Sequence, residues 1–266
     1  MQEKIDNMIS TQPIFVAFIL TLVFSLLSIA VGLPTMQGDM DKQVAMFIMA
    51  LYQSFLAVLA LIIMTKLKIL STTDFSFKNS GKGLLLGWIV FVLMAIIILS
   101  SYFARNEYFT SLNPPFLIII ILFTLSTGIL EEVIFRGLIL KILIPKNATK
   151  KNIILAFLIS AALFSLVHLI HLFWAGPLDV IGDLLFAVAG GMLLGAIYLR
   201  TKTLIAPILL HWLLNLSGGI FEAFTSPEYL IAETNLNDVM VLALIAALPL
   251  VIVAFFLIRK VDTQLT

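Results

Sequence analysis

Cysteine is absent from this 266-residue chain, and charged residues are scarce. Without cysteine the chain has no disulfides, no thiol nucleophile and no thiolate metal ligand. Only 12% of its residues are charged, whereas a soluble domain carries about 25%. The formal net charge of +1 leaves no basic surplus for phosphates, so nucleic acid is not an expected partner. With a mean hydropathy of +1.14, the chain falls in the membrane class.

Apolar stretches long enough for a transmembrane helix recur along the chain. A bilayer core about 30 Å thick needs about 20 apolar residues in helical conformation. We expect about eight spans, at residues 14–33, 44–65, 83–104, 115–139, 153–174, 184–200, 203–222 and 239–258. The expected fold is therefore an all-α polytopic membrane protein, with residues 1–266 in a single integral membrane domain.

Basic residues in the connections predict the orientation of the spans. Most of the 16 lysines and arginines lie near the N-terminus, in every second connection or in the C-terminal tail. Because cytoplasmic loops carry an excess of Lys and Arg, we expect a multi-pass protein of the cell membrane with both termini in the cytoplasm.

Two glutamates and an arginine lie inside the fourth expected span. Ionisable side chains within a membrane segment are costly and indicate a functional site. Glu132 and Arg136 are separated by one helical turn and can pair, whereas Glu131 points about 100° away from Glu132. Glu131 is therefore expected to face a cavity, where a poorly solvated carboxylate suits a general base. The alternative is a buried ion pair that only locks two helices together.

The chain has only three histidines, and all lie in apolar stretches. His168, in the fifth span, can hold a water between its imidazole and Glu131. His171 is expected near the external end, hydrogen-bonded to a neighbouring carbonyl. His211 and Asn215 share a helix face and offer two donors toward one point, as a developing oxyanion requires. The alternative for this last pair is interhelical hydrogen bonding.

Other signatures are weak or absent. No Gly-x-Ser-Gly presents a serine nucleophile, and Gly182-Asp183 is expected at a loop edge without an intramembrane aspartate as partner. Gly191 and Gly195 form a Gly-x-x-x-Gly in the sixth span, which predicts close helix packing inside the bundle.

The three polar motifs together resemble those of the CPBP family of intramembrane proteases. The motifs are Glu-Glu-x-x-x-Arg at 131–136, Phe-x-x-x-His at 164–168 and His-x-x-x-Asn at 211–215, in that order on successive apolar helices. Gly137 and the stretch 198–201 are also similar to the family. The family includes CAAX prenyl protease 2 and bacterial proteins of the Abi group, which are linked to bacteriocin processing or self-immunity. The resemblance covers about residues 115–220, the expected catalytic core.

The resemblance implies roles for these residues. Glu131 and His168 would activate a water that attacks a peptide carbonyl, while His211 and Asn215 would stabilise the oxyanion. Glu132 and Arg136 would support them. We expect no cofactor, because Asn215 is a poor zinc ligand and the chain has no His-Glu-x-x-His. The alternative is a zinc site of Glu131, His168 and His211.

The resulting hypothesis is an intramembrane endopeptidase that acts on a hydrophobic or membrane-anchored peptide. Its catalytic water would lie in a cavity open to the cytoplasm or sideways to lipid. Two alternatives come from other classes: a bacteriocin immunity protein that sequesters a peptide without cleaving it, and a proton-coupled transporter. A transporter is disfavoured, because the sequence has no internal repeat. The expected partners are the peptide and the lipid bilayer.

Overall fold

The computed structural model describes residues 2–37, 40–105, 109–173, 175–224 and 236–261, and its regular elements in these ranges are helices. Most are α-helical, with short 3-10 segments and one π-helical segment, η3. Their bounds are α1 Gln2–Thr11, α2 Pro13–Gln37, α3 Lys42–Lys66, η1 Phe77–Asn79, α4 Ser80–Leu86, α5 Trp88–Arg105, α6 Pro114–Glu132, η3 Val133–Ile139, α7 Leu140–Leu143, α8 Lys150–Leu166, η4 Val167–Phe173, α9 Pro177–Thr201, α10 Ile205–Gly219, η5 Ile220–Phe224 and α11 Leu236–Ile258.

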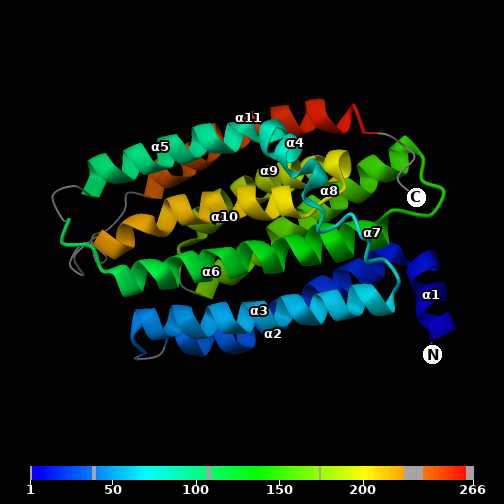
Figure 1. Ribbon diagram of the computed structural model, residues 1–266, viewed down its shortest axis with the longest axis horizontal. Helices are drawn as coiled ribbons and strands as arrows, with labels where there is room; N and C mark the ends of the chain where they lie inside the picture. Colours follow the sequence, from blue (N-terminus) through cyan, green and yellow to red (C-terminus); the bar gives the residue numbers. More distant parts are fainter. Residues whose placement is uncertain (1, 38–39, 106–108, 174, 225–235, 262–266) are drawn as a thin grey trace.

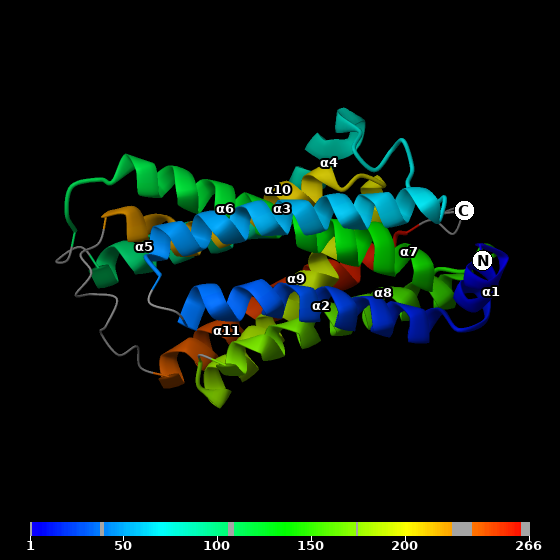
Figure 2. The ribbon, with the colours of Figure 1, turned by 90° about the horizontal axis from the view of Figure 1, so that it is seen from below.

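The long helices run roughly along one axis, and α1 crosses them at one end (Figure 1). Helix α6 lies between α3 on one side and α10 on the other (Figure 1). Helix α9 packs against α8 and α11, and α2 packs beside α3 (Figure 2). The elements that carry the predicted site therefore pack against one another, while their outer faces expose apolar residues such as Ile118 of α6 and Leu155 of α8.

Six described helices are long and apolar enough to cross a membrane, and a seventh span results if the bent pair α4–α5 is counted as one. The sequence predicted about eight spans, and the remaining predicted span falls on α11. The predicted span 83–104 is broken at Gly87, where the two halves meet at 61°. A side chain at Gly87 would collide with Leu210, since a Cβ there would lie 2.3 Å from Cδ1. The predicted span 239–258 coincides with α11, which runs from Leu236 to Ile258.

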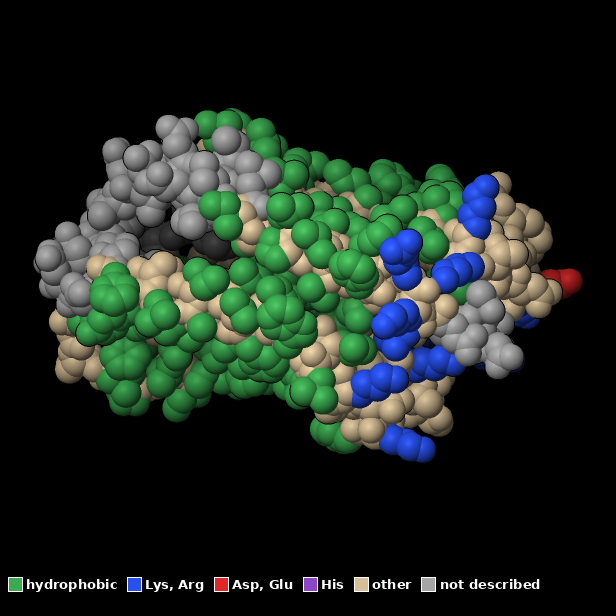
Figure 3. All heavy atoms as spheres, turned by 90° about the horizontal axis from the view of Figure 1, so that it is seen from above, with side chains coloured by type: hydrophobic (Ala, Val, Ile, Leu, Met, Phe, Trp, Pro, Cys, Tyr) green, Lys and Arg blue, Asp and Glu red, His purple; other side chains and the backbone are tan. Residues whose placement is uncertain are grey.

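Charge is distributed unevenly over the surface. In Figure 3 hydrophobic side chains cover most of the described surface, while lysines and arginines gather at one end. Helix α1 and the C-terminal end of α11 lie at the same end of the bundle (Figures 1 and 2). We call this the basic end. A hydrophobic band with a charged end is the surface expected of a multi-pass membrane protein.

A buried aspartate that the sequence analysis did not single out organises the basic end. Asp74 is 1% exposed and accepts hydrogen bonds from Lys141 Nζ at 2.5 Å and Tyr198 Oη at 3.0 Å. Its backbone carbonyl accepts from the amide of Leu204 at 2.6 Å. Asp74 thereby ties the connection after α3 to α7, to α9 and to the start of α10. This bonding fixes the α9–α10 turn from which the helix carrying His211 begins.

Candidate active site

The two glutamates lie where α6 changes its helical geometry. Helix α6 ends at Glu132, and the chain continues as π-helical segment η3 over Val133–Ile139. Such π-helical turns are rare and frequently occur at functional sites. Arg136 Nη1 donates to Glu132 Oε1 at 2.6 Å, with side-chain exposures of 2% and 0%. The predicted Glu132–Arg136 pair is therefore present and fully buried.

Arg136 also connects this segment to the two neighbouring helices. Its Nη2 donates to the carbonyl of Gly191 on α9 at 3.1 Å. Its guanidinium lies over the ring of Phe164 on α8, 4.7 Å from the centroid. Because guanidinium donors are arranged in a rigid fork, one arginine can hold a carboxylate and a carbonyl at once. Arg136 thus fixes Glu132 relative to α8 and α9.

His211 lies between the two glutamates. Its Nδ1 is 2.8 Å from Glu132 Oε1, and its Nε2 is 3.4 Å from Glu131 Oε2. Since the Arg136-paired carboxylate of Glu132 can only accept, Nδ1 carries the hydrogen of this bond. The Glu132–His211 bond was not expected from the sequence, which predicted a shared role for His211 and Asn215 instead.

A close approach of α6 and α10 makes this contact possible. A Cβ at Gly128 of α6 would lie 3.2 Å from the backbone nitrogen of Trp212 on α10. Glycine at this position therefore lets the helices approach until their backbones nearly touch. The approach brings His211 within hydrogen-bonding distance of a carboxylate near the end of α6.

His168 lies just beyond the end of α8, in 3-10 segment η4. Its Nδ1 is 3.1 Å from the carbonyl oxygen of Phe164. A carbonyl only accepts, so Nδ1 donates and Nε2 presents a lone pair in the neutral ring. The Phe164 ring meets both imidazoles edge to face, with centroid distances of 5.2 Å to His168 and 5.8 Å to His211. Phe164 thus acts as a spacer between the two histidines.

His171 has a different partner from the expected carbonyl. Its Nδ1 is 2.7 Å from Asp183 Oδ2, and its ring centroid is 5.4 Å from that of His168. The prediction that Asp183 lies at a loop edge is wrong, because α9 begins at Pro177 and places Asp183 inside the helix. The partner was missed because the contact joins two helices.

One cavity of about 550 Å³ brings together all four predicted catalytic side chains: Glu131, His168, His211 and Asn215. His171 also lines it. The supporting pair, Glu132 and Arg136, lies behind the wall and is buried. Helices α2 and α3 close the opposite side with apolar residues and with hydroxyl and amide groups; among these are Phe24, Ser25, Ser28, Met46, Met49 and Gln53.

The cavity extends from Glu131 away from the basic end. It reaches Glu222, which pairs with Lys42 at the first turn of α3, and the start of α3 lies at the far end of the bundle from α1 (Figure 1). The sequence analysis expected a cavity open to the cytoplasm or to lipid. If the basic end is cytoplasmic, the cavity extends through the outer half of the bundle, and its opening to the cytoplasm or sideways to lipid stays a prediction.

Within the described residues, no three His, Asp or Glu side chains are grouped so that they could hold a metal ion. Both nitrogens of His211 face carboxylates, and Nδ1 of His168 is occupied by a carbonyl.

Two adjacent glycines of α9, Gly190 and Gly191, allow a prediction about the stability of the wall of the site. A Cβ at Gly191 would lie 3.0 Å from Phe164 Cδ1 and 3.3 Å from Ala161 Cα, whereas a Cβ at Gly190 meets nothing within 4 Å. Gly191→Ala is therefore expected to lower the free energy of unfolding by about 1–3 kcal/mol through overpacking. Gly190→Ala is the matched control, and we expect no loss, because alanine favours the helix. Thermal unfolding in detergent measures both, and equal losses would contradict the packing argument.

Comparison with known proteins agrees with the resemblance seen in the motifs. Residues 113–217 match the family model described as type II CAAX prenyl endopeptidase Rce1-like, a region that covers less than half of the chain. It spans α6 to α10 and contains every predicted catalytic residue. No curated protein gives a significant match to this chain. Residues 113–217 of this multi-pass membrane protein therefore resemble the domain of Rce1-like type II CAAX prenyl endopeptidases.

Proposed function

We propose that the protein is an intramembrane endopeptidase in which Glu131 and His168 activate a water. The observation that carries this proposal is the single cavity lined by Glu131, His168, His211 and Asn215, which come from three different helical segments. Polar side chains that converge inside an apolar bundle from separate helices are typical of a catalytic site.

The proposed reaction is hydrolysis of a peptide bond. Glu131 takes a proton from the water, and the Nε2 lone pair of His168 accepts a hydrogen bond from the same water. The hydroxide oxygen then bonds to the carbonyl carbon, and a tetrahedral oxyanion forms. When the C–N bond breaks, the protonated Glu131 returns its proton to the leaving amine. Water is the only co-reactant.

His211 and Asn215 are proposed to stabilise the oxyanion. The Asn215 carboxamide lines the cavity one turn from His211. Because Nδ1 of His211 already donates to Glu132, its Nε2 donates only in the imidazolium form. The carboxylate of Glu132, 2.8 Å from Nδ1, favours this form, since Glu131 is already protonated when the oxyanion develops. Removal of one such oxyanion donor typically lowers kcat by about 10²–10³.

The wall opposite the catalytic residues favours a hydrophobic peptide as substrate. Phe24 of α2, together with Met46 and Met49 of α3, lines the same cavity as Glu131. Both helices lie outside the matched region 113–217. The Rce1-like domain would then provide the chemistry, while the N-terminal helices select the peptide. Methionine-rich walls adapt to different apolar side chains.

We also propose that the basic end faces the cytoplasm, with both termini there. The support is the gathering of lysines and arginines at the end where α1 begins and α11 ends (Figure 3). A single cysteine introduced at Lys260 of this cysteine-free chain tests the orientation. Labelling of intact cells by an impermeant maleimide would contradict it.

Cleavage of a quenched fluorescent library of hydrophobic peptides by detergent-purified protein tests the proposed activity. We expect internal cleavage, identified by mass spectrometry of both fragments, at a rate unchanged by a metal chelator. Loss of cleavage on chelation, restored by zinc, would overturn the metal-free mechanism and favour a site of Glu131, His168 and His211.

Tight binding of a peptide without any cleavage would instead support the sequestering immunity protein. Proton-coupled flux in proteoliposomes would support the transporter. Neither outcome is expected, because a water-activating Glu131–His168 pair has no role in sequestration.

A further inference from the structure

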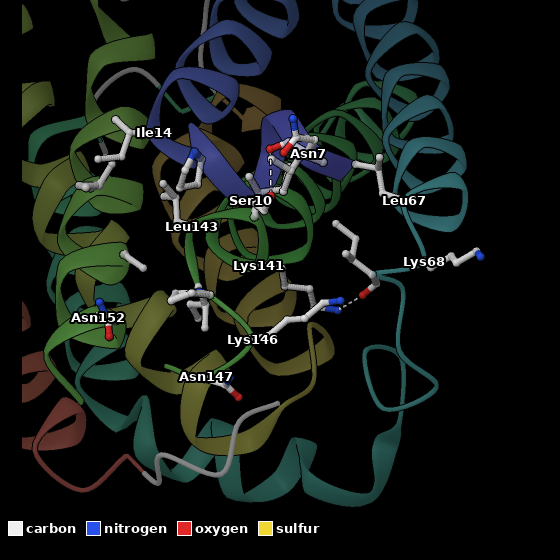
Figure 4. A pocket seen from close by; sticks show the side chains of 18 of the residues that line it. Asn7, Ser10, Ile14, Leu67, Lys68, Lys141, Leu143, Lys146, Asn147 and Asn152 are labelled. Atoms are coloured by element: carbon white, nitrogen blue, oxygen red, sulfur yellow. Dashed lines mark hydrogen bonds between the residues drawn. The ribbon is translucent and has the colours of Figure 1, made fainter. Parts of the chain in front are cut away.

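A second cavity, of about 1400 Å³, lies at the basic end of the bundle (Figure 4). It is bounded by α1, by the segment 67–69 after α3 and by residues 141–147, which comprise most of α7 and the start of its connection to α8. None of the described residues that line it also lines the cavity of Glu131. The two cavities are therefore separate, and the proposed catalytic chemistry gives the second one no role.

The wall of this cavity is basic. Four lysines line it, and Glu3 is the one carboxylate among its described lining residues; the lysines are Lys4, Lys68, Lys141 and Lys146. Lys141 is held by Asp74 and by the carbonyl of Ile69 at 2.8 Å. The other three lysines form no ion pair within the described part of the chain. The cavity thus carries positive charge that its own wall does not neutralise.

Polar and apolar groups are separated within the cavity. The lysines accompany Asn7 and Ser10 of α1, which crosses the end of the bundle (Figures 1 and 4). Deeper along the bundle axis, the wall consists of Ile14 on α2 with Leu155 and Ile159 on α8. Ile14 is 53% exposed and Leu155 is 52% exposed, although both belong to transmembrane helices. An apolar surface therefore leads from the cavity down the outside of the bundle into the bilayer.

We propose that this cavity binds an anionic phospholipid. The lysines would hold the phosphate of the headgroup, and the acyl chains would lie along α2 and α8. A soluble anion would match the lysines but leave the apolar wall exposed, and a neutral lipid would leave the charge unbalanced. By the positive-inside rule, the basic end lies at the surface of the cytoplasmic leaflet. At that surface each lysine contributes to the attraction of anionic lipids.

Thermal stability of the detergent-purified chain with added lipid tests the proposal. Ligands that bind only the folded state raise the Tm in proportion to their occupancy. We expect phosphatidylglycerol to raise the Tm in a saturable manner, with little effect from phosphatidylcholine or from glycerol phosphate at equal concentration. Equal shifts with glycerol phosphate would show a simple anion site, and equal shifts with phosphatidylcholine would show that charge is irrelevant. Either result overturns the proposal.

A pair of triple variants separates this cavity from the general charge of the basic end. Lys4→Gln/Lys68→Gln/Lys146→Gln is expected to weaken phosphatidylglycerol binding by about 100-fold, since three cationic contacts are lost. The control, Lys78→Gln/Lys82→Gln/Lys151→Gln, removes three exposed lysines that do not line the cavity and should change the affinity less than threefold. If both triple variants lost similar affinity for phosphatidylglycerol, the lipid would be attracted by the general charge of the basic end rather than bound in this cavity. The assay requires no peptide cleavage, so its outcome is independent of the proposed protease activity.

Discussion

Replacement of Glu131 by glutamine is expected to lower kcat for peptide cleavage by about 10²–10⁴-fold, the usual contribution of a general base. Glutamine has nearly the same shape but cannot take a proton from water. The side chain of Glu131 is 23% exposed and faces the cavity, so the exchange leaves no buried charge behind. Single-turnover rates measured on a peptide cleaved by the wild-type protein give the effect directly.

Two controls make this result specific. Asp179→Asn removes a carboxylate from the first turn of α9, at a position that does not line the cavity, and should keep kcat within about twofold. The Tm of the Glu131→Gln variant should stay close to that of the wild type. Full activity in Glu131→Gln would exclude Glu131 as the base, and unfolding of this variant would assign it a structural role instead.

Arg136→Met is expected to lower the free energy of unfolding by about 3–5 kcal/mol. The loss of one partner from a buried pair leaves the other charge uncompensated. Glu132 has no exposed side-chain surface, and its Oε2 already lacks a hydrogen bond within the described structure. After the exchange, His211 Nδ1 is the remaining described partner of this carboxylate. Denaturant or thermal unfolding in detergent measures the change.

A second substitution tests whether charge is the cause. Glu132→Gln/Arg136→Met removes both charges and retains an amide oxygen that can accept from His211. Replacement of a whole buried pair is often nearly neutral, so the double variant should recover most of the lost stability. If it is no more stable than Arg136→Met, the loss comes from the contacts of Arg136 with Gly191 and Phe164 rather than from the buried charge.

The helical arrangement of the site was predictable where a local rule applies. Glu132 and Arg136 are four residues apart on one helix, and this spacing alone brings them together. Glu131 faces the cavity because a neighbouring position on the helix points about 100° away. Gly191 and Gly195 pack inside the bundle against Phe164 and Phe157 of α8, as the small-residue pattern indicates.

Contacts between residues far apart in the chain were not predictable from one sequence. His211 forms a hydrogen bond with Glu132, which is 79 positions away in the sequence, and Tyr198 forms one with Asp74, which is 124 positions away. Each contact depends on how closely two helices approach, and this distance depends on glycines such as Gly128 and on the side chains opposite them. The periodicity of the sequence does not indicate which helix packs against which other helix.

The shape of the predicted span 83–104 was likewise not predictable from the sequence. Hydropathy identifies stretches long enough to cross a membrane, and it places 83–104 among them. It does not reveal the 61° bend at Gly87, where the backbone packs closely against Leu210 of another helix.

The sequence by itself determined the membrane class, the all-α architecture and the candidate residues for the proposed chemistry, because the cost of charge in lipid and the helical repeat act locally along the chain. Only the tertiary structure decided that Glu131, His168, His211 and Asn215 share one cavity, that this cavity extends away from the basic end, and that α2 and α3 form its other wall. These properties depend on helix packing, in which the position of each side chain is fixed by neighbours that are distant in the sequence.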